Sequence, residues 1–143
     1  MKRRSDKLKK VVTLAATEER EFGAATGRSQ QLLSEQQDRL GELNAFRQSY
    51  AERDVGEVSA MQLKDYHSFL SRLDTAVKTQ QQIVNDCEQN LEVQRQRWTV
   101  KRQKRESLER VLEKSREREA VFQERLQQKL MDDLVRPRDP HKD

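Results

Sequence analysis

The sequence predicts an all-α protein, a long antiparallel two-helix coiled-coil hairpin with unequal arms. Of the 143 residues, 33% are hydrophobic, which is too few for a compact globular domain, and 38% are charged, which is too many. Glycine occurs only four times, and both prolines, Pro137 and Pro140, lie near the C-terminal end. Most of the remaining residues are good helix formers such as Gln, Glu, Arg, Lys, Leu and Ala. Elongated helices fit this composition, because each needs only one apolar stripe.

The first helix is expected over about residues 5–53, where apolar side chains recur every three or four residues. Its predicted stripe is interrupted by Ser29 and Gln36. Gly23 and Gly27 form a GxxxG pattern in polar surroundings, which we interpret as close approach of two helices or local flexibility. The stripe consists of Leu8, Val11, Val12, Ala15, Phe22, Ala25, Leu32, Leu33, Leu40, Leu43, Phe46 and Tyr50.

A loop is expected over residues 54–59, because Gly56 interrupts the helical pattern there. Ser59 has the features of a helix N-cap, and Gln62 three residues later completes a capping box. Val58 and Leu63 fit a hydrophobic staple around the same helix start. A loop this short makes the flanking helices antiparallel neighbours.

The second helix is expected over about residues 60–133 and carries a clearer heptad repeat, which implies a left-handed supercoil. Because it is longer than the first helix, its C-terminal part is expected to extend without a partner. Residues 1–135 are therefore predicted to form a single hairpin, and residues 136–143, with their two prolines, a flexible tail. The heptad positions are Leu70, Val77, Val84, Leu91, Trp98, Arg105, Leu112, Glu119 and Leu126.

Several classes of protein are disfavoured by what the sequence lacks. It contains no apolar run long enough to cross a membrane and no secretory signal, so we expect no direct membrane insertion. The lone Cys87 fits a reducing compartment. Glycine-rich phosphate loops and metal-binding motifs are missing, and His67 and His141 are far apart in sequence. We therefore expect no enzymatic activity, no cofactor and no metal.

Two basic clusters dominate the charge pattern. Residues 1–10 carry a net charge of +5 and residues 95–105 a net charge of +6, whereas residues 11–94 carry −6. A hairpin folded about residues 56–57 places Leu8 opposite roughly residue 105, which would bring the clusters together. Either an acidic partner binds there, or the clusters are solvated by counterions. The cluster residues are Lys2, Arg3, Arg4, Lys7, Lys9, Lys10, Arg95, Arg97, Lys101, Arg102, Lys104 and Arg105.

Nucleic acid is a possible acidic partner, but the sequence disfavours it. Aromatic residues are only 5% of the chain, and no zinc knuckle, RNA-recognition signature or forked basic region is present.

Apolar residues are unusually abundant on both sides of the loop. Leu43, Phe46 and Tyr50 form one stripe on the first helix, and Phe69, Leu73, Ala76 and Gln80 form another on the second. Phe69 and Ala76 lie about 100° around the helix from the main heptad stripe, at one-residue offset. This surplus predicts either a partner site or thicker packing near the loop.

The order of these motifs resembles the FliJ family, the small soluble coiled-coil proteins of the bacterial flagellar type III export apparatus. The resemblance begins with the basic stretch before Leu8 and includes Leu43-x-x-Phe46-x-x-x-Tyr50. It continues with Tyr66-x-x-Phe69-Leu70-x-x-Leu73-x-x-Ala76-Val77, and with Trp98 followed by Lys101, Arg102, Lys104 and Arg105. Stalk proteins of virulence secretion systems share this architecture. The alternatives that remain are such a stalk, a generic cytoplasmic coiled-coil scaffold or homodimer, and a nucleic-acid-binding coiled coil.

The resemblance implies a function and partners that composition does not. Family members look like the central stalk of rotary ATPases, so the resemblance implies that the termini bind the hexameric export ATPase and that the loop end contacts the export gate membrane protein through its cytoplasmic domain. It also implies an escort role for export chaperones and a cytoplasmic location, peripherally associated with the inner-membrane export apparatus. Arg39 and Gln80 stand where other members carry different polar residues. The implied gate-binding residues are Arg39, Leu43, Phe46, Tyr50, Phe69, Leu73, Ala76 and Gln80.

Overall fold

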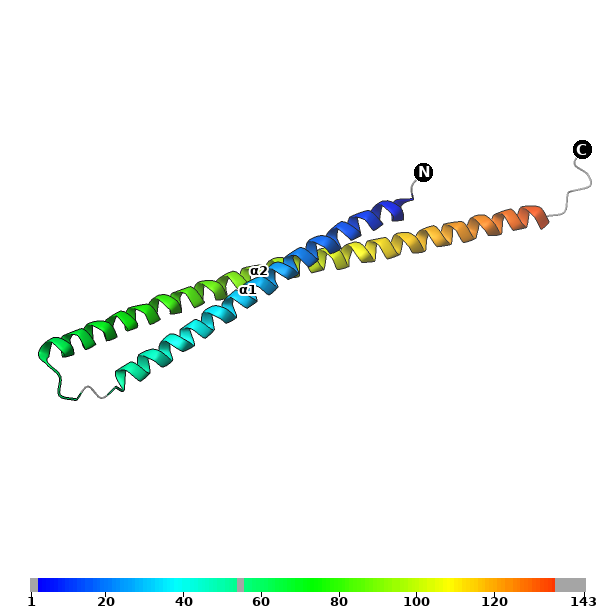
Figure 1. Cartoon of the computed structure of the whole chain (residues 1–143). Coiled ribbons are helices and arrows are strands. Elements are labelled where there is room, and N and C mark those ends of the chain that lie inside the picture. Colours follow the sequence, from blue (N-terminus) through cyan, green and yellow to red (C-terminus); the bar gives the residue numbers. More distant parts are fainter. Residues whose placement is uncertain (1–2, 54–55, 136–143) are drawn as a thin grey trace, which may run out of the picture. The chain divides into compact units, whose positions relative to one another are not determined.

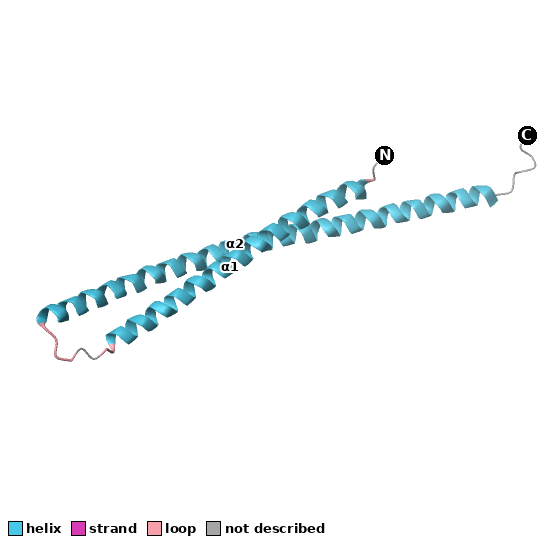
Figure 2. Cartoon of the chain, in the orientation of Figure 1, coloured by secondary structure: helices cyan, strands magenta, loops and turns pink. Residues whose placement is uncertain are grey.

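The computed structural model describes residues 3–53 and 56–135 and contains two helices, α1 (Arg4–Ala51) and α2 (Ala60–Val135) (Figure 1). Within those ranges there is no strand, as the secondary-structure colouring in Figure 2 shows. The all-α prediction is confirmed, and the helix bounds agree with the expected ones within two residues. Lys2, part of the predicted loop (54–55) and the predicted tail (136–143) lie outside the described residues.

The chain divides into two compact units, one built from residues 1–19 and 101–143, which we call the terminal unit, and one from residues 20–100, the loop unit. Each pairs a segment of α1 with a segment of α2. In the terminal unit Ser5 contacts Glu119 and Glu19 contacts Arg105. In the loop unit Gln36 contacts Gln80 and Tyr50 contacts Tyr66. In each unit, later residues of α1 contact earlier residues of α2. The two helices are therefore antiparallel, which confirms the predicted hairpin.

The core is a thin seam, by which we mean the row of residues that each helix turns toward the other. In the loop unit Leu33, Val84 and Leu91 are at most 6% exposed, and Leu40 and Cys87 pack against them. In the terminal unit Ala15 and Leu112 are the buried apolar residues. So narrow a core suits a chain with 33% hydrophobic residues.

Side chains of Ser59 and of α2 form hydrogen bonds with backbone groups at the helix ends next to the loop. The Ser59 amide donates a hydrogen bond to Gln62 Oε1 at 3.1 Å, and the Gln62 amide donates to Ser59 Oγ at 3.2 Å, which confirms the capping box. The Tyr66 hydroxyl lies 3.1 Å from the carbonyl oxygens of both Tyr50 and Ala51 and donates to them. Both carbonyls belong to the last turn of α1, and that of Tyr50 also accepts a hydrogen bond from the Arg53 amide at 3.3 Å.

In the loop unit the Trp98 indole lies close to Gly23. A Cβ atom added to Gly23 would stand 3.1 Å from Trp98 Nε1 and 3.2 Å from Cε2, whereas one added to Gly27 would meet nothing within 4 Å. The GxxxG pair therefore splits into two roles. Gly23 makes room for the indole, as the interpretation of close helix approach predicts, and Gly27 faces open space.

The predicted register of the hairpin is wrong. Arg105 pairs with Glu19, and Ser5 with Glu119, so Leu8 does not lie opposite residue 105. The prediction placed the centre of the fold at the middle of the loop. Near the loop, however, Tyr66 stacks on Tyr50, and Met61 in the first turn of α2 is 74% exposed, so pairing begins only some residues into α2. The difference is larger toward the termini, where Arg105 pairs with Glu19, eleven residues from Leu8.

Candidate interaction surfaces

Four aromatic rings cluster in the loop unit next to the loop. Tyr50 and Tyr66 are stacked with centroids 5.1 Å apart, and Phe69 meets Tyr50 edge-on at 4.7 Å. Phe46 meets Phe69 edge-on at 6.5 Å. The Arg53 guanidinium lies 5.2 Å from the Tyr50 ring centroid. All of the rings except Phe46 border a hollow of about 440 Å³, which is lined by Tyr50, Gln62, Asp65, Tyr66, Ser68, Phe69 and Arg72.

Below the aromatic cluster the seam contains a polar layer. Gln80 is 8% exposed, and its Nε2 donates hydrogen bonds to the Gln36 carbonyl oxygen at 3.0 Å and to Gln36 Oε1 at 2.7 Å. Arg47 and Asp74 form an ion pair between the cluster and this layer, and the carboxylate of Asp74 raises the pKa of Arg47. Gln36, which interrupts the apolar stripe in the sequence, is therefore matched by a polar residue on α2.

The second basic cluster is paired with acidic residues of α1 in the terminal unit. Glu18 Oε2 lies 3.2 Å from Lys101 Nζ and 3.7 Å from Lys104 Nζ. Hydrogen bonding and charge from Lys101 lower the pKa of Glu18. Glu19 pairs with Arg105 and, at 3.8 Å, with Arg102.

The expectation that the two basic clusters face each other is therefore wrong. With the register shifted, the level of residues 101–105 is occupied by Glu18 and Glu19 rather than by residues 2–10. In the loop unit, Arg95 Nη2 donates to Gln30 Oε1 at 3.1 Å, and Arg97 is exposed. The described part of the first cluster is exposed throughout and comprises Arg3, Arg4, Lys7, Lys9 and Lys10.

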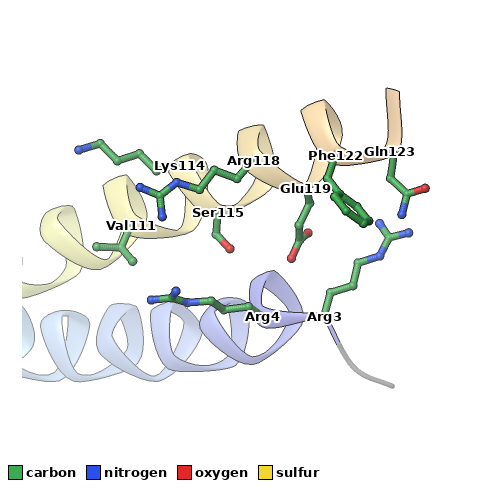
Figure 3. A pocket seen from close by; sticks show the side chains of 9 residues that line it. All are labelled: Arg3, Arg4, Val111, Lys114, Ser115, Arg118, Glu119, Phe122 and Gln123. Atoms are coloured by element: carbon green, nitrogen blue, oxygen red, sulfur yellow. The ribbon is translucent and has the colours of Figure 1, made fainter. Parts of the chain in front are cut away.

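At the level of the first cluster, α2 caps the start of α1. Glu119 Oε1 accepts a hydrogen bond from the Ser5 amide at 3.1 Å, and Oε2 accepts one from the Ser5 hydroxyl at 2.6 Å. These bonds lower the pKa of Glu119. Figure 3 shows Glu119 pointing from α2 toward the first turn of α1, beside a groove of about 510 Å³. The groove is lined by Arg3, Arg4, Val111, Lys114, Ser115, Arg118, Glu119, Phe122 and Gln123.

A family model described as flagellar FliJ protein matches residues 4–138, nearly the whole chain and both helices. The chain belongs to the FliJ family. It is thus a component of the flagellar export apparatus. No curated protein and no solved structure matches the chain.

The residues that the FliJ family resemblance assigns to gate binding are distributed between surface and seam. Arg39 is exposed, Phe46 is 52% exposed and Phe69 is 36% exposed. Leu43, Tyr50 and Ala76 are half-buried. Leu73 and Gln80 are each 8% exposed and face α1. Phe46, Tyr50 and Phe69 are brought together in the aromatic cluster, whereas Gln80 is engaged with Gln36.

Sequence reasoning missed the roles of two polar residues at heptad positions of α2. Arg105 and Glu119 are the only polar members of the heptad series that begins at Leu70. Each contacts a partner on α1, Glu19 in one case and Ser5 in the other. A charged residue at a seam position, together with the corrected register, is the signal that would have identified both pairs.

The described residues 3–53 and 56–135 include no group of His, Cys, Asp or Glu side chains that could hold a metal ion. Neither α1 nor α2, over the residues described, is long and apolar enough to cross a membrane.

Proposed function

We propose that this FliJ family member is a stalk that binds the export ATPase hexamer through its terminal unit and the export gate through the loop end of its loop unit. An asymmetric helix pair contacts the subunits of a ring unequally, and unequal contacts bias the nucleotide states of those subunits. The action proposed is mechanical and allosteric, so the chain itself catalyses no reaction.

The observation that carries the ATPase part of the proposal is the exposed end of α2. Residues 120–135 are all exposed, although this stretch contains large apolar side chains. Their exposure ranges from 44% for Leu126 to 83% for Leu134. A helix that leaves so much apolar surface in water is typical of a partner-binding segment. The exposed set is Val121, Phe122, Leu126, Leu130, Met131, Leu134 and Val135.

The gate part of the proposal assigns contact and support to different residues. Phe46 and Phe69, the most exposed of the aromatic pair partners, make the contact, with Arg39, Leu43, Tyr50 and Ala76 around them. Leu73 and Gln80 support this surface from within the seam, because their side chains are turned toward α1. Substituting Leu73 would therefore weaken the helix pair as well as any binding.

The remaining parts of the proposal are an escort role for export chaperones and a cytoplasmic location, with peripheral association at the inner membrane. Both rest on membership of the FliJ family.

The ATPase assignment is tested by measuring ATP turnover of the purified export ATPase with and without the chain, and co-purification in the same sample. The variant Leu126→Gln/Leu130→Gln/Leu134→Gln is expected to lose stimulation and to keep gate binding. Met61→Gln, which alters an exposed apolar residue in the loop unit, is the matched control. Unchanged stimulation by the triple variant would contradict the assignment.

The gate assignment is tested by binding of the cytoplasmic domain of the gate protein to Phe46→Ala/Phe69→Ala. We expect at least tenfold weaker binding, with unchanged helicity and unchanged ATPase stimulation. Met61→Ala again provides the control for loss of exposed apolar surface beside the loop. Full gate affinity in the double variant would rule out this surface.

A further inference from the structure

One face of the terminal unit differs from the other in composition, and of its residues only Val121 belongs to the segment proposed to bind the ATPase. In both helices, residues one position before the seam positions lie on a common side, because the helices are antiparallel and the flanking positions of each therefore face those of the other. We call this side the leading face. It comprises Arg4, Lys7, Val11 and Leu14 of α1, and Val111, Lys114, Arg118 and Val121 of α2.

The groove beside Glu119 shows that the two rows adjoin. Arg4 of α1 lines it together with Val111, Lys114 and Arg118 of α2, as Figure 3 shows. A second hollow, lined by α2 alone, shares Lys114 and Arg118 and adds Glu117, Val121 and Arg125. At the level of Arg4 the leading face is therefore a furrow with one wall from each helix.

The leading face is rich in exposed aliphatic side chains. Val11 is 45% exposed, Leu14 61%, Val111 42% and Val121 44%. Each row repeats at three- and four-residue spacing, which is the spacing that a packed helix requires. Two rows with this spacing, on adjoining helices, offer the two sides of the furrow into which a third helix packs in a coiled coil.

The charged residues among the eight leading-face residues named above are all basic, whereas Glu18, farther along α1, is paired with Lys101 and Lys104. Arg4, Lys7, Lys114 and Arg118 are exposed, and none of them forms an ion pair with a carboxylate in the described part of the chain. The only acidic group lining the groove, Glu119, is engaged with Ser5. The furrow thus combines apolar side chains with uncompensated positive charge.

The opposite face of the same unit has neither property. The residues that follow the seam positions include Asp6, Lys9 and Thr13 on α1, and Glu109, Glu113, Arg116 and Ala120 on α2. Acidic and basic residues are mixed there, and large apolar side chains are replaced by threonine and alanine. The contrast indicates that the composition of the leading face is not a general property of this surface.

We propose that the leading face binds a helix of another protein, with apolar residues at heptad spacing flanked by aspartate or glutamate, to form a three-helix coiled coil. The aliphatic rows bury its apolar stripe, and the four cations pair with its acidic flanks. A nucleic acid would satisfy the cations but would leave the valines and Leu14 exposed. A second copy using the same face would set cations against cations. The inference shares Val121 with the segment assigned to the ATPase and no residue with the gate assignment.

The probe for this site is a fluorescein-labelled synthetic peptide of three heptads, with leucine at seam positions and glutamate at the flanking positions. Fluorescence anisotropy measures its binding to the full chain. Arg4→Glu/Arg118→Glu is expected to weaken binding at least tenfold, and so is Leu14→Gln/Val111→Gln. The matched controls are Lys9→Glu/Arg116→Glu, with the same charge change on the opposite face, and Met61→Gln. Both should leave binding within twofold, with helicity checked for every variant.

Further measurements distinguish the proposed helix from a nucleic acid or a second copy of the chain as the partner of the leading face. A peptide of the same composition in scrambled order should bind at least tenfold more weakly, because it lacks an apolar stripe. Equal binding of the scrambled peptide, or equal loss in the Lys9→Glu/Arg116→Glu control, would overturn the proposal. The proposal would also be overturned if single-stranded DNA competes with the peptide and if DNA binding is weakened by Arg4→Glu/Arg118→Glu but not by Leu14→Gln/Val111→Gln. Sedimentation of the chain as a dimer that the peptide dissociates would instead assign the face to self-association.

Discussion

The carboxylate of Glu119 in α2 accepts hydrogen bonds from both the amide and the hydroxyl of Ser5 in α1. The first amides of a helix lack intrahelical acceptors, and the N-terminal end of the helix dipole favours negative charge. A glutamate from the neighbouring helix meets both requirements. Glu119 interrupts the apolar heptad of α2 because it completes the start of α1.

Replacing Glu119 by alanine is expected to loosen the first turn of α1. Without the carboxylate, the Ser5 amide and hydroxyl turn to water, and amides of residues 5–8 should exchange hydrogen faster, by roughly threefold or more. Hydrogen exchange read by mass spectrometry measures this. Glu117→Ala, an exposed glutamate two residues away, should leave the exchange unchanged. Equal effects of the two substitutions would show that charge alone, rather than the hydrogen bonds, protects this turn.

Acid should weaken the terminal unit before it weakens the loop unit. The pKa values of Glu18 and Glu119 are lowered in the folded chain by Lys101 and Ser5, respectively. A carboxyl group with a lowered folded pKa stabilises fully above its unfolded pKa of about 4.3 and loses that contribution as the pH falls toward the folded value. Thermal unfolding followed between pH 7 and 3 should therefore show a falling midpoint temperature below about pH 5, as the contribution of these carboxylates to stability is lost. In Glu18→Gln/Glu119→Gln the stability to heating should depend less on pH in this acidic range. An unchanged pH dependence would contradict the contribution assigned to these two carboxylates.

Alanine substitutions should separate the two glycines of the GxxxG pair. Gly27→Ala is expected to stabilise the chain by about 0.5–1 kcal/mol, because alanine favours helix and a Cβ there meets nothing. Gly23→Ala should raise the free energy of unfolding by less, since the added Cβ would press on Trp98. Urea unfolding monitored by circular dichroism compares them. If Gly23→Ala and Gly27→Ala gain equally, the indole moves aside without penalty.

Removing the polar layer should raise stability and lower specificity. In Gln36→Leu/Gln80→Leu, apolar side chains fill the seam where two amides now bond to each other. Buried polar residues in coiled coils fix register and oligomeric state at the expense of stability. We expect a higher urea midpoint together with dimers in sedimentation experiments, whereas Gln81→Leu, an exposed neighbour, should change neither. A double variant that stays strictly monomeric would show that the layer does not select the pairing.

Most of the fold was predictable because helix-forming composition, heptad spacing and caps are local properties. The Ser59–Gln62 capping box requires only residues three apart, and it was predicted correctly. The register was not, because it depends on side-chain contacts between the helices, such as Tyr50 with Tyr66 and Glu19 with Arg105, and no short-range pattern encodes them. The resulting offset, eleven residues at Arg105, assigned the wrong partners to the basic cluster at residues 101–105.

The candidate sites were predictable only in outline. A sequence stripe identifies Phe69, Leu73 and Gln80 together, yet only the packed structure distinguishes the exposed phenylalanine from the two residues turned into the seam. The leading face needs two rows from segments about a hundred residues apart in the chain. It becomes visible only once Arg4 and Arg118 are known to line the same groove.

The hydrogen bonds that finish α1 at both of its ends come from side chains of α2, Glu119 at Ser5 and Tyr66 at Tyr50 and Ala51. An insertion or deletion within α1 alone would detach one of these ends from its partner. Length changes in this lineage should therefore arise as matched pairs, one in each helix, and in whole heptads. The paired stretches of the two helices, which on α2 run from Tyr66 to Glu119, can lengthen or shorten over evolutionary time only together.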